Sequence, residues 1–436
     1  MRKEINAIAF PAIISNITTP LLGLVDVAVT GHIGSAVFLG AIAVGGSMFN
    51  MLYWLFGFLR MGSSGLTAQA FGASDKKGID VVLWRAMAIA FIGGFILIVL
   101  STPLGSLVLK FMDADDSTQQ LARDYFSICI WGAPAVLGTY ALSGWFLGLQ
   151  NSKIPMLVAI VTNIVNIGVS ITLVFGYHLK LSGVATGTLS AQWIGFLTAA
   201  FIAWRKYHPA LPKLKAILNK TELARFFRIN SDIFLRTLCL VTVTLWFTHA
   251  GAVQGTDILA ANALLLQLFM LFSYFMDGFA FAGEALTGKF YGAGNYHALS
   301  TLERKLLVTG VCFGFIFGAL YLVAGESFLS LLAEDRNVVN AASDYIIWAA
   351  TMPLCGFGAF VYDGIFIGLT RTRGMLASMA IAMVVFFTLY FSFLNKLGNN
   401  ALWLAFNAYL LVRGLVEWLI LHSRRTFCES SNPKLP

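Results

Sequence analysis

Long stretches without a charged side chain constrain this sequence more than any other feature. Three of them cover residues 86–109, 154–177 and 181–204. Each exceeds the roughly 20 residues that a helix needs to cross the hydrocarbon core of a bilayer. None alternates between apolar and polar residues as a transmembrane β-strand does. The sequence therefore predicts an all-α integral membrane protein, consistent with 58% hydrophobic and only 11% charged residues.

Turn signals and charges divide the chain into twelve predicted spans. The N-terminal segment lacks the short apolar core and small-residue cleavage site of a signal peptide, so we expect residue 1 to stay in the cytoplasm. The predicted spans are 5–30, 42–70, 80–110, 119–149, 154–177, 181–206, 222–250, 258–290, 302–332, 338–368, 373–396 and 399–423.

The distribution of basic residues orients these spans. Of the 29 Lys and Arg residues, 21 fall in connections on one face of the predicted bundle, 5 on the other face and 3 within spans. By the positive-inside rule, both termini and the basic segment 204–228 face the cytoplasm. This topology accounts for the net charge of +8 without a nucleic-acid partner. We predict that 204–228 is a solvated linker, and a regulatory or lipid-binding role is the alternative.

Two halves of the sequence repeat with a constant offset of 220 residues. "LTAQAFGASD" at 66 matches "LTGKFYGAGN" at 286, "DYFSICIWGAP" at 124 matches "DYIIWAATMP" at 344, and "GWFLGLQNSK" at 144 matches "GIFIGLTRTR" at 364. We predict two six-helix lobes related by a pseudo-two-fold axis along the membrane normal, with substrate held between them. The predicted domains are an N-lobe (1–204), a cytoplasmic linker (205–221) and a C-lobe (222–436).

The repeat does not extend to the charges. At the 220-residue offset, four charged residues correspond to uncharged ones: Asp26 to Trp246, Arg60 to Ala280, Glu284 to Ser64 and Asp363 to Ser143. We infer that the scaffold was duplicated and the chemistry was not.

Ionisable side chains at bilayer depth are costly, so each needs either a partner or a function. Asp232 and Arg236 lie four residues apart in the seventh predicted span, and Arg413 and Glu417 repeat this spacing in the twelfth. Because residues i and i+4 are neighbours on a helix surface, we predict two structural ion pairs.

A second group of charges is predicted in the cytoplasmic half of the membrane. It comprises Arg60 in the second span, Asp277 and Glu284 in the eighth, and Asp363 in the tenth. Two interpretations stay open, namely a gate or scaffold network and direct handling of substrate or protons.

Asp26 differs from every other acid because it alone is predicted in the outer half of the bilayer. Its helix leaves the membrane near His32, about 9 Å further along at 1.5 Å per residue. A short Asp side chain cannot reach bulk water over that distance. The carboxyl must face a cavity or hold a proton, and its charge then depends on how hydrated the cavity is. A proton-coupled transporter requires that dependence.

The fifth predicted span carries a polar stripe at a similar depth. Asn163, Asn166 and Ser170 follow the spacing i, i+3, i+7 and share one helix face. We predict that they form one hydrogen-bonded site with Asp26, and plain interhelical hydrogen bonding is the alternative. Pro11 and Pro20 are predicted to kink the first span, as a hinge or as a static bend.

Four segments together resemble one transporter family. They are "FLRMGSSGLTAQAFGA" (58–73), "NSDIFLRTLCL" (230–240), "DGFAFAGEALTGKFYGAGN" (277–295) and "YDGIFIGLTRTRGM" (362–375). They resemble the multidrug and toxic compound extrusion (MATE) transporters, in particular the DinF-like branch. The resemblance covers almost the whole chain in order.

The resemblance implies export of cationic, amphipathic drugs and toxic metabolites from bacteria across the cytoplasmic (inner) membrane, driven by inward H⁺ or Na⁺ movement. By resemblance, Asp26 matches a first-helix aspartate used for cation coupling, Asn166 a fifth-helix asparagine and Thr188 a sixth-helix threonine. Asp363 matches a tenth-helix aspartate of other branches. Where many relatives carry a second acid, four residues after the asparagine, this chain has Ser170.

We therefore expect a proton-coupled antiporter in which Asp26 is the protonation site. The alternatives are Na⁺-coupled efflux by the same fold and flipping of a lipid-linked precursor. No protease motif indicates an enzyme, and the five cysteines lack the spacing of a metal or redox site. We expect no cofactor beyond H⁺ or Na⁺, no metal, and a monomer embedded in membrane lipid.

Overall fold

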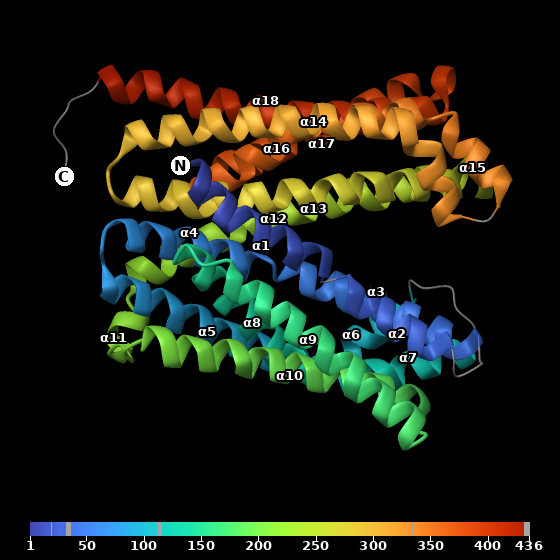
Figure 1. Cartoon of the computed structure of the whole chain (residues 1–436), viewed down its shortest axis with the longest axis horizontal. Helices are drawn as coiled ribbons and strands as arrows, with labels where there is room; N and C mark the ends of the chain where they lie inside the picture. Colours follow the sequence, from blue (N-terminus) through green and yellow to red (C-terminus); the bar gives the residue numbers. More distant parts are fainter. Residues whose placement is uncertain (19, 32–35, 111–115, 334, 431–436) are drawn as a thin grey trace. The chain divides into compact units, whose positions relative to one another are not determined.

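The computed structural model describes residues 1–18, 20–31, 36–110, 116–333 and 335–430. Within them every regular element is a helix and no strand occurs, so the all-α class is confirmed (Figure 1). The first half contains α1 (Arg2–Thr18), α2 (Leu21–Gly31), α3 (Ala36–Leu55), α4 (Phe58–Gly72), α5 (Lys76–Val99), α6 (Ser101–Lys110), α7 (Asp116–Cys129), η1 (Ile130–Gly132), α8 (Ala133–Gly148), α9 (Lys153–Ile171), η2 (Thr172–Gly176) and α10 (Lys180–Tyr207). The second half contains α11 (Leu214–Ile217), α12 (Lys220–Val253), α13 (Thr256–Gly292), α14 (Tyr296–Leu332), α15 (Arg336–Ser343), α16 (Ile346–Gly368), α17 (Thr372–Leu397) and α18 (Asn399–Ser430).

The chain forms two compact units. The N-terminal unit is Phe10–Asn230, and the C-terminal unit combines Met1–Ala9 with Ser231–Pro436. Two helices therefore cross the division, since α1 starts in the C-terminal unit and α12 starts in the N-terminal unit. Each unit is described below by itself.

Eleven helical segments of the described residues are long and apolar enough to cross a membrane. They correspond to eleven of the twelve predicted spans. The remaining predicted span, the sixth (181–206), is the 28-residue helix α10. Its Gly, Ser, Thr and Gln residues lower its hydropathy, which explains why it is not among the eleven. The multi-pass helical character predicted from the sequence is confirmed.

Several predicted spans are interrupted in the structure, among them the second, which is divided between α3 and α4. The first is divided between α1 and α2 at Pro20, and its predicted outer end, His32, lies outside the described residues. The third is divided at Leu100, and Pro103 falls in the first turn of the following helix, where a missing N–H costs little. The tenth begins with the short helix α15 before α16. Pro11 lies inside α1 without ending it.

The 220-residue repeat is visible in the packing of each unit. A Cβ atom added at Gly144 of α8 would lie 2.1 Å from the Arg60 carbonyl oxygen of α4. At the equivalent positions, a Cβ added at Gly364 of α16 would lie 2.2 Å from the Ala280 carbonyl oxygen of α13. Both helix pairs are thus in backbone contact that only glycine allows. The duplication predicted from the motifs extends to atomic packing.

The basic linker is held against the first turns of α5. The Arg85 guanidinium donates to the carbonyls of Ala216 and Ile217, each at 3.2 Å. The Trp84 indole N–H donates to the Ala210 carbonyl at 3.1 Å. The connection between the halves is therefore packed onto the N-terminal unit at these points and is not wholly solvated.

Candidate functional site

Asp26 lies in α2, and its side chain is buried, with 4% of its surface exposed. Three side chains from three other helices of the N-terminal unit donate hydrogen bonds to its carboxyl. The Asn166 amide of α9 donates to Oδ1 at 3.1 Å. The Thr188 hydroxyl of α10 and the Tyr125 hydroxyl of α7 donate to Oδ2 at 2.8 and 3.2 Å. Four helices therefore meet at one carboxyl group.

A close approach of α9 and α10 brings Asn166 and Thr188 together. A Cβ atom added at Gly187 would lie only 2.1 Å from the Ser170 hydroxyl oxygen, so the absence of a side chain lets α10 sit directly on α9. The next residue, Thr188, then accepts a hydrogen bond from the Asn166 amide at 3.0 Å while donating to Asp26. The close packing of Gly187 against Ser170 thus places Thr188 within hydrogen-bonding distance of both Asn166 and Asp26.

The electrostatic environment of Asp26 is unusual because all three of its partners are neutral. In the part of the chain that the structure describes, no Lys, Arg or His side chain forms an ion pair with Asp26. Hydrogen bonds to a charged acceptor are stronger than neutral ones and offset part of the cost of burying the carboxylate. Within the described residues the carboxyl is thus held by neutral donors alone.

Three buried oxygen atoms of the polar stripe have no hydrogen-bond partner among the described residues. They are Oδ1 of Asn163, Oδ1 of Asn166 and the hydroxyl oxygen of Ser170. Buried polar atoms without partners are uncommon and call for an explanation such as a water or an ion. The amide and hydroxyl oxygens of these side chains are hard ligands. Such oxygens can accept a hydrogen bond from water or coordinate Na⁺.

The four predicted N-lobe residues do not contribute equally. Asn166 and Thr188 contact the carboxyl directly, and Ser170 is fully buried beside Gly187. Asn163 lies on the same helix face, but its amide donates to the backbone carbonyls of Thr18 at 2.9 Å and Ala159 at 3.1 Å. It therefore ties α9 to the end of α1, and among the described residues its side chain forms no hydrogen bond with Asp26.

Tyr125 is the site residue that sequence reasoning missed. It stands in the "DYFSICIWGAP" segment, which we used only to establish the repeat. Its side chain is buried, with 3% exposed, and its hydroxyl points at Asp26. Tyr hydroxyls usually find a partner when buried, and that tendency was the available signal.

The charges of the C-terminal unit are paired differently from our prediction. Arg236 of α12 and Arg413 of α18 both form ion pairs with the same carboxylate, Asp363 of α16. The predicted separate pairs within α12 and α18 are therefore wrong. Both helices turn these arginines towards α16, where one carboxylate oxygen contacts both guanidinium groups.

The acids predicted to pair within their own helices have other partners. The Thr372 hydroxyl donates to Asp232 at 2.7 Å, and the Ser378 hydroxyl donates to the buried Glu417 at 2.9 Å.

The residues of the predicted inner-half network are distributed over both units. Asp363 joins the two arginines of the C-terminal unit, and Asp277 and the fully buried Glu284 lie in α13 of the same unit. Arg60 belongs to α4 of the N-terminal unit. A gating or transport role for these residues stays a prediction.

Comparison with known proteins gives consistent matches over the whole chain. The MatE family model matches residues 11–172 and 232–392, once in each half. The DNA damage-inducible protein F of Escherichia coli (strain K12) is 38% identical over 420 residues, covering 95% of this chain and 90% of its own. The protein DETOXIFICATION 44, chloroplastic, of Arabidopsis thaliana is 26% identical, covering 87% of this chain and 74% of its own. A crystal structure of MATE in the bent conformation superposes with a TM-score of 0.88 at 18% identity, covering 98% of this chain and 96% of that chain.

Proposed function

Because this chain belongs to the MATE family of multidrug and toxic compound transporters, we propose that it exports cationic or amphipathic small molecules in exchange for an inward-moving proton. In this proposal Asp26 is the group that binds the proton. The observation that carries the proposal is the geometry of Asp26, a buried carboxyl held by three neutral donors without a basic partner.

The proposed cycle follows from the charge of that carboxyl. With Asp26 ionised, the buried negative charge favours a nearby cationic substrate. A proton arriving from outside neutralises the carboxylate, so the attraction is lost and the substrate leaves. The neutral site then returns inward, where the proton dissociates. Exchange of this kind requires that the affinity for the substrate depends on whether the proton is bound.

A single carboxylate favours H⁺ over Na⁺ in this proposal. A proton needs one oxygen atom, whereas Na⁺ needs several oxygen ligands and compensating charge. Ser170, at the position of a second acid in many relatives, supplies no charge. The unpaired oxygens of Asn166 and Ser170 nevertheless support Na⁺ coupling as the second candidate.

Flipping of a lipid-linked precursor has less support. It requires basic side chains able to bind a pyrophosphate. Arg236 and Arg413, two of the three arginines within the predicted spans, are engaged with Asp363. We further propose that the protein acts as a monomer without a cofactor or an enzymatic activity, in the bacterial cytoplasmic membrane with both termini inside.

Transport by purified protein in liposomes tests the proposal. A pH gradient, inside acidic, or a matched Na⁺ gradient is imposed, and uptake of a fluorescent lipophilic cation is followed. We expect the pH gradient to drive uptake and Asp26→Asn to reduce the rate at least about tenfold, towards that of protein-free liposomes. Asp257→Asn, the same substitution at an exposed acid, is the matched control and should retain the rate.

Two results would redirect the proposal. Full pH-driven uptake by Asp26→Asn would exclude Asp26 as the coupling site. Uptake driven by Na⁺ at equal pH on both sides, and abolished in Asp26→Asn, would keep the site and replace the coupling ion.

A further inference from the structure

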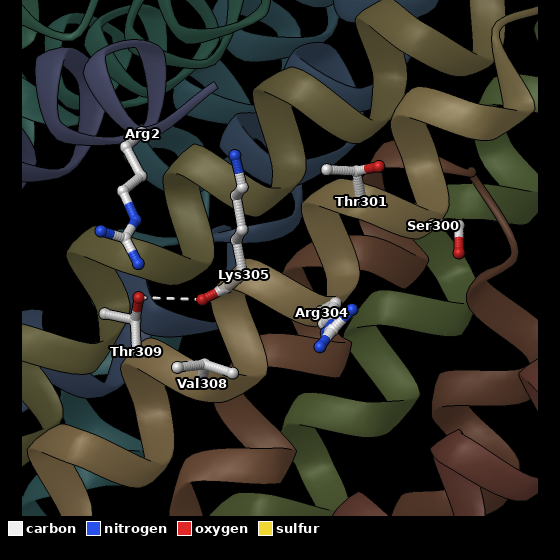
Figure 2. Close-up of a pocket in the computed structure, with 7 residues that line it drawn as sticks. All are labelled: Arg2, Ser300, Thr301, Arg304, Lys305, Val308 and Thr309. Carbon is white, nitrogen blue, oxygen red and sulfur yellow. Dashed lines mark hydrogen bonds between the residues drawn. The ribbon is translucent and has the colours of Figure 1, made fainter.

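A basic pocket opens in the C-terminal unit, and its lining includes none of the charged residues described above. It lies between the first turn of α1 and the first turns of α14 and has a volume of about 450 Å³. Figure 2 shows Arg2 coming from α1 and six further residues from α14. Three of the lining side chains are basic, namely Arg2, Arg304 and Lys305. A pocket of this size accommodates a small polar ligand.

The three cations have no acidic partner in the part of the chain that the structure describes. The two acids closest to them in sequence are engaged elsewhere. Glu4 accepts from the N-terminal amine at 2.9 Å and from Lys289 at 3.2 Å. Glu303 accepts from the Tyr362 hydroxyl at 3.2 Å and is buried. The pocket therefore concentrates positive charge that an anion would compensate.

The hydroxyl groups of the pocket divide into two sets. Thr301 and Thr309 donate to backbone carbonyls of α14 at 3.1 and 2.8 Å, the second of these visible in Figure 2. The Ser300 hydroxyl forms no hydrogen bond with any described residue, so it can donate to a ligand. Guanidinium, ammonium and hydroxyl donors together match the oxygens of a phosphate group.

The location of the pocket selects among phosphate-bearing ligands. α14 has 37 residues and is about 55 Å long, well beyond the roughly 30 Å hydrocarbon core. Its exposed apolar side chains Val308, Phe315 and Leu322 follow Arg304 at intervals of four, seven and seven residues, which places all four on one helix face. The basic pocket thus lies at the end of a surface suited to acyl chains.

We propose that this pocket binds the phosphate of an anionic phospholipid headgroup, on the side of the membrane predicted to be cytoplasmic. Basic pockets between helices on that side are a known arrangement for anionic headgroups. The phosphate contacts Arg2, Arg304 and Lys305, and the acyl chains lie along the exposed face of α14. Such a lipid would join the N-terminal turn of α1 to α14 within the C-terminal unit.

Lipid-dependent thermal stabilisation of the purified full-length protein in detergent tests this proposal. The unfolding midpoint is titrated with phosphatidylglycerol, with phosphatidylcholine and with inorganic phosphate. We expect phosphatidylglycerol to raise the midpoint at a much lower concentration than the other two. Replacing two of the three cations in Arg304→Gln/Lys305→Gln should raise its half-saturating concentration about thirtyfold.

The pair Lys76→Gln/Lys77→Gln is the matched control. It also removes two adjacent, exposed positive charges on the predicted cytoplasmic side, but these residues do not line the pocket. We expect it to bind phosphatidylglycerol as the wild type does. Equal weakening in both variants, or equal effects of phosphatidylglycerol and phosphatidylcholine, would overturn the proposal. Saturation by inorganic phosphate at the concentrations effective for phosphatidylglycerol would identify a soluble anion as the ligand and overturn it as well.

Discussion

Equivalent positions in the two halves have opposite chemistry. Asp26 lies among neutral hydrogen-bond donors, whereas its counterpart at the 220-residue offset, Trp246, lies among aromatic rings. The Trp246 ring is 5.5 Å from Phe387 and 5.7 Å from Phe391, measured between ring centroids. The counterparts of Asn166 and Ser170 are Phe386 and Tyr390. Duplication therefore preserved the backbone contacts of Gly144 and Gly364 but replaced a polar site with an apolar cluster.

The two buried aspartates also differ in their partners. Asp363 is held between two guanidinium groups, whose positive charges stabilise its ionised form. Asp26 has three hydrogen bonds and no cation within the described residues, so nothing fixes its charge. We therefore propose that Asp363 stabilises the C-terminal unit, whereas Asp26 changes its charge during the transport cycle.

The largest expected effect comes from neutralising the paired aspartate. Asp363→Asn leaves Arg236 and Arg413 buried without their shared counter-charge, and breaking a buried pair in this way costs about 3–5 kcal/mol. We expect a loss of that size in the free energy of unfolding, measured by denaturant titration in detergent. Adding Arg413→Gln to Asp363→Asn should recover part of the loss. A single variant as stable as the wild type would contradict the structural role of Asp363.

The duplicated scaffold predicts equal effects at equivalent glycines. Gly144→Ala and Gly364→Ala each place a Cβ about 2 Å from a carbonyl oxygen of the neighbouring helix, and overpacking of this kind costs about 1–3 kcal/mol. We expect similar losses of unfolding free energy in both variants. Gly168→Ala is the control, since nothing lies within 4 Å of its added Cβ. A clear loss in one variant alone would show that the two helix contacts are not equivalent.

A smaller effect is expected when one donor is removed from Asp26. Thr188→Val deletes the hydroxyl that donates to Asp26 and accepts from Asn166, leaving two buried groups each short of one partner. We expect an unfolding free energy lower by about 1–3 kcal/mol. Thr188→Ser retains the hydroxyl and should lose less. If the Val and Ser variants are equally stable, the hydrogen bonds of Thr188 do not hold the site together.

Sequence periodicity predicted those parts of the protein that depend on one helix at a time. The spans, the buried Asp26 and the stripe of Asn166 and Ser170 all follow from spacing along a single helix. The contribution of Tyr125 and the shared partner Asp363 did not follow from it. They depend on the relative orientation of helices that are far apart in sequence. The spacing of residues within one helix does not determine that orientation. The ion pairs predicted from i, i+4 spacing were wrong because both arginines contact Asp363 on another helix.

The pH dependence of substrate binding tests the central claim, that the charge of Asp26 controls the hold on a cation. A lipophilic cation is titrated into the purified protein in detergent over a range of pH, without any gradient. For the wild type we predict an affinity that falls by up to about tenfold per unit as the pH decreases, because one proton competes with the substrate. For Asp26→Asn we predict an affinity that does not change with pH. The same pH dependence in both proteins would contradict the account.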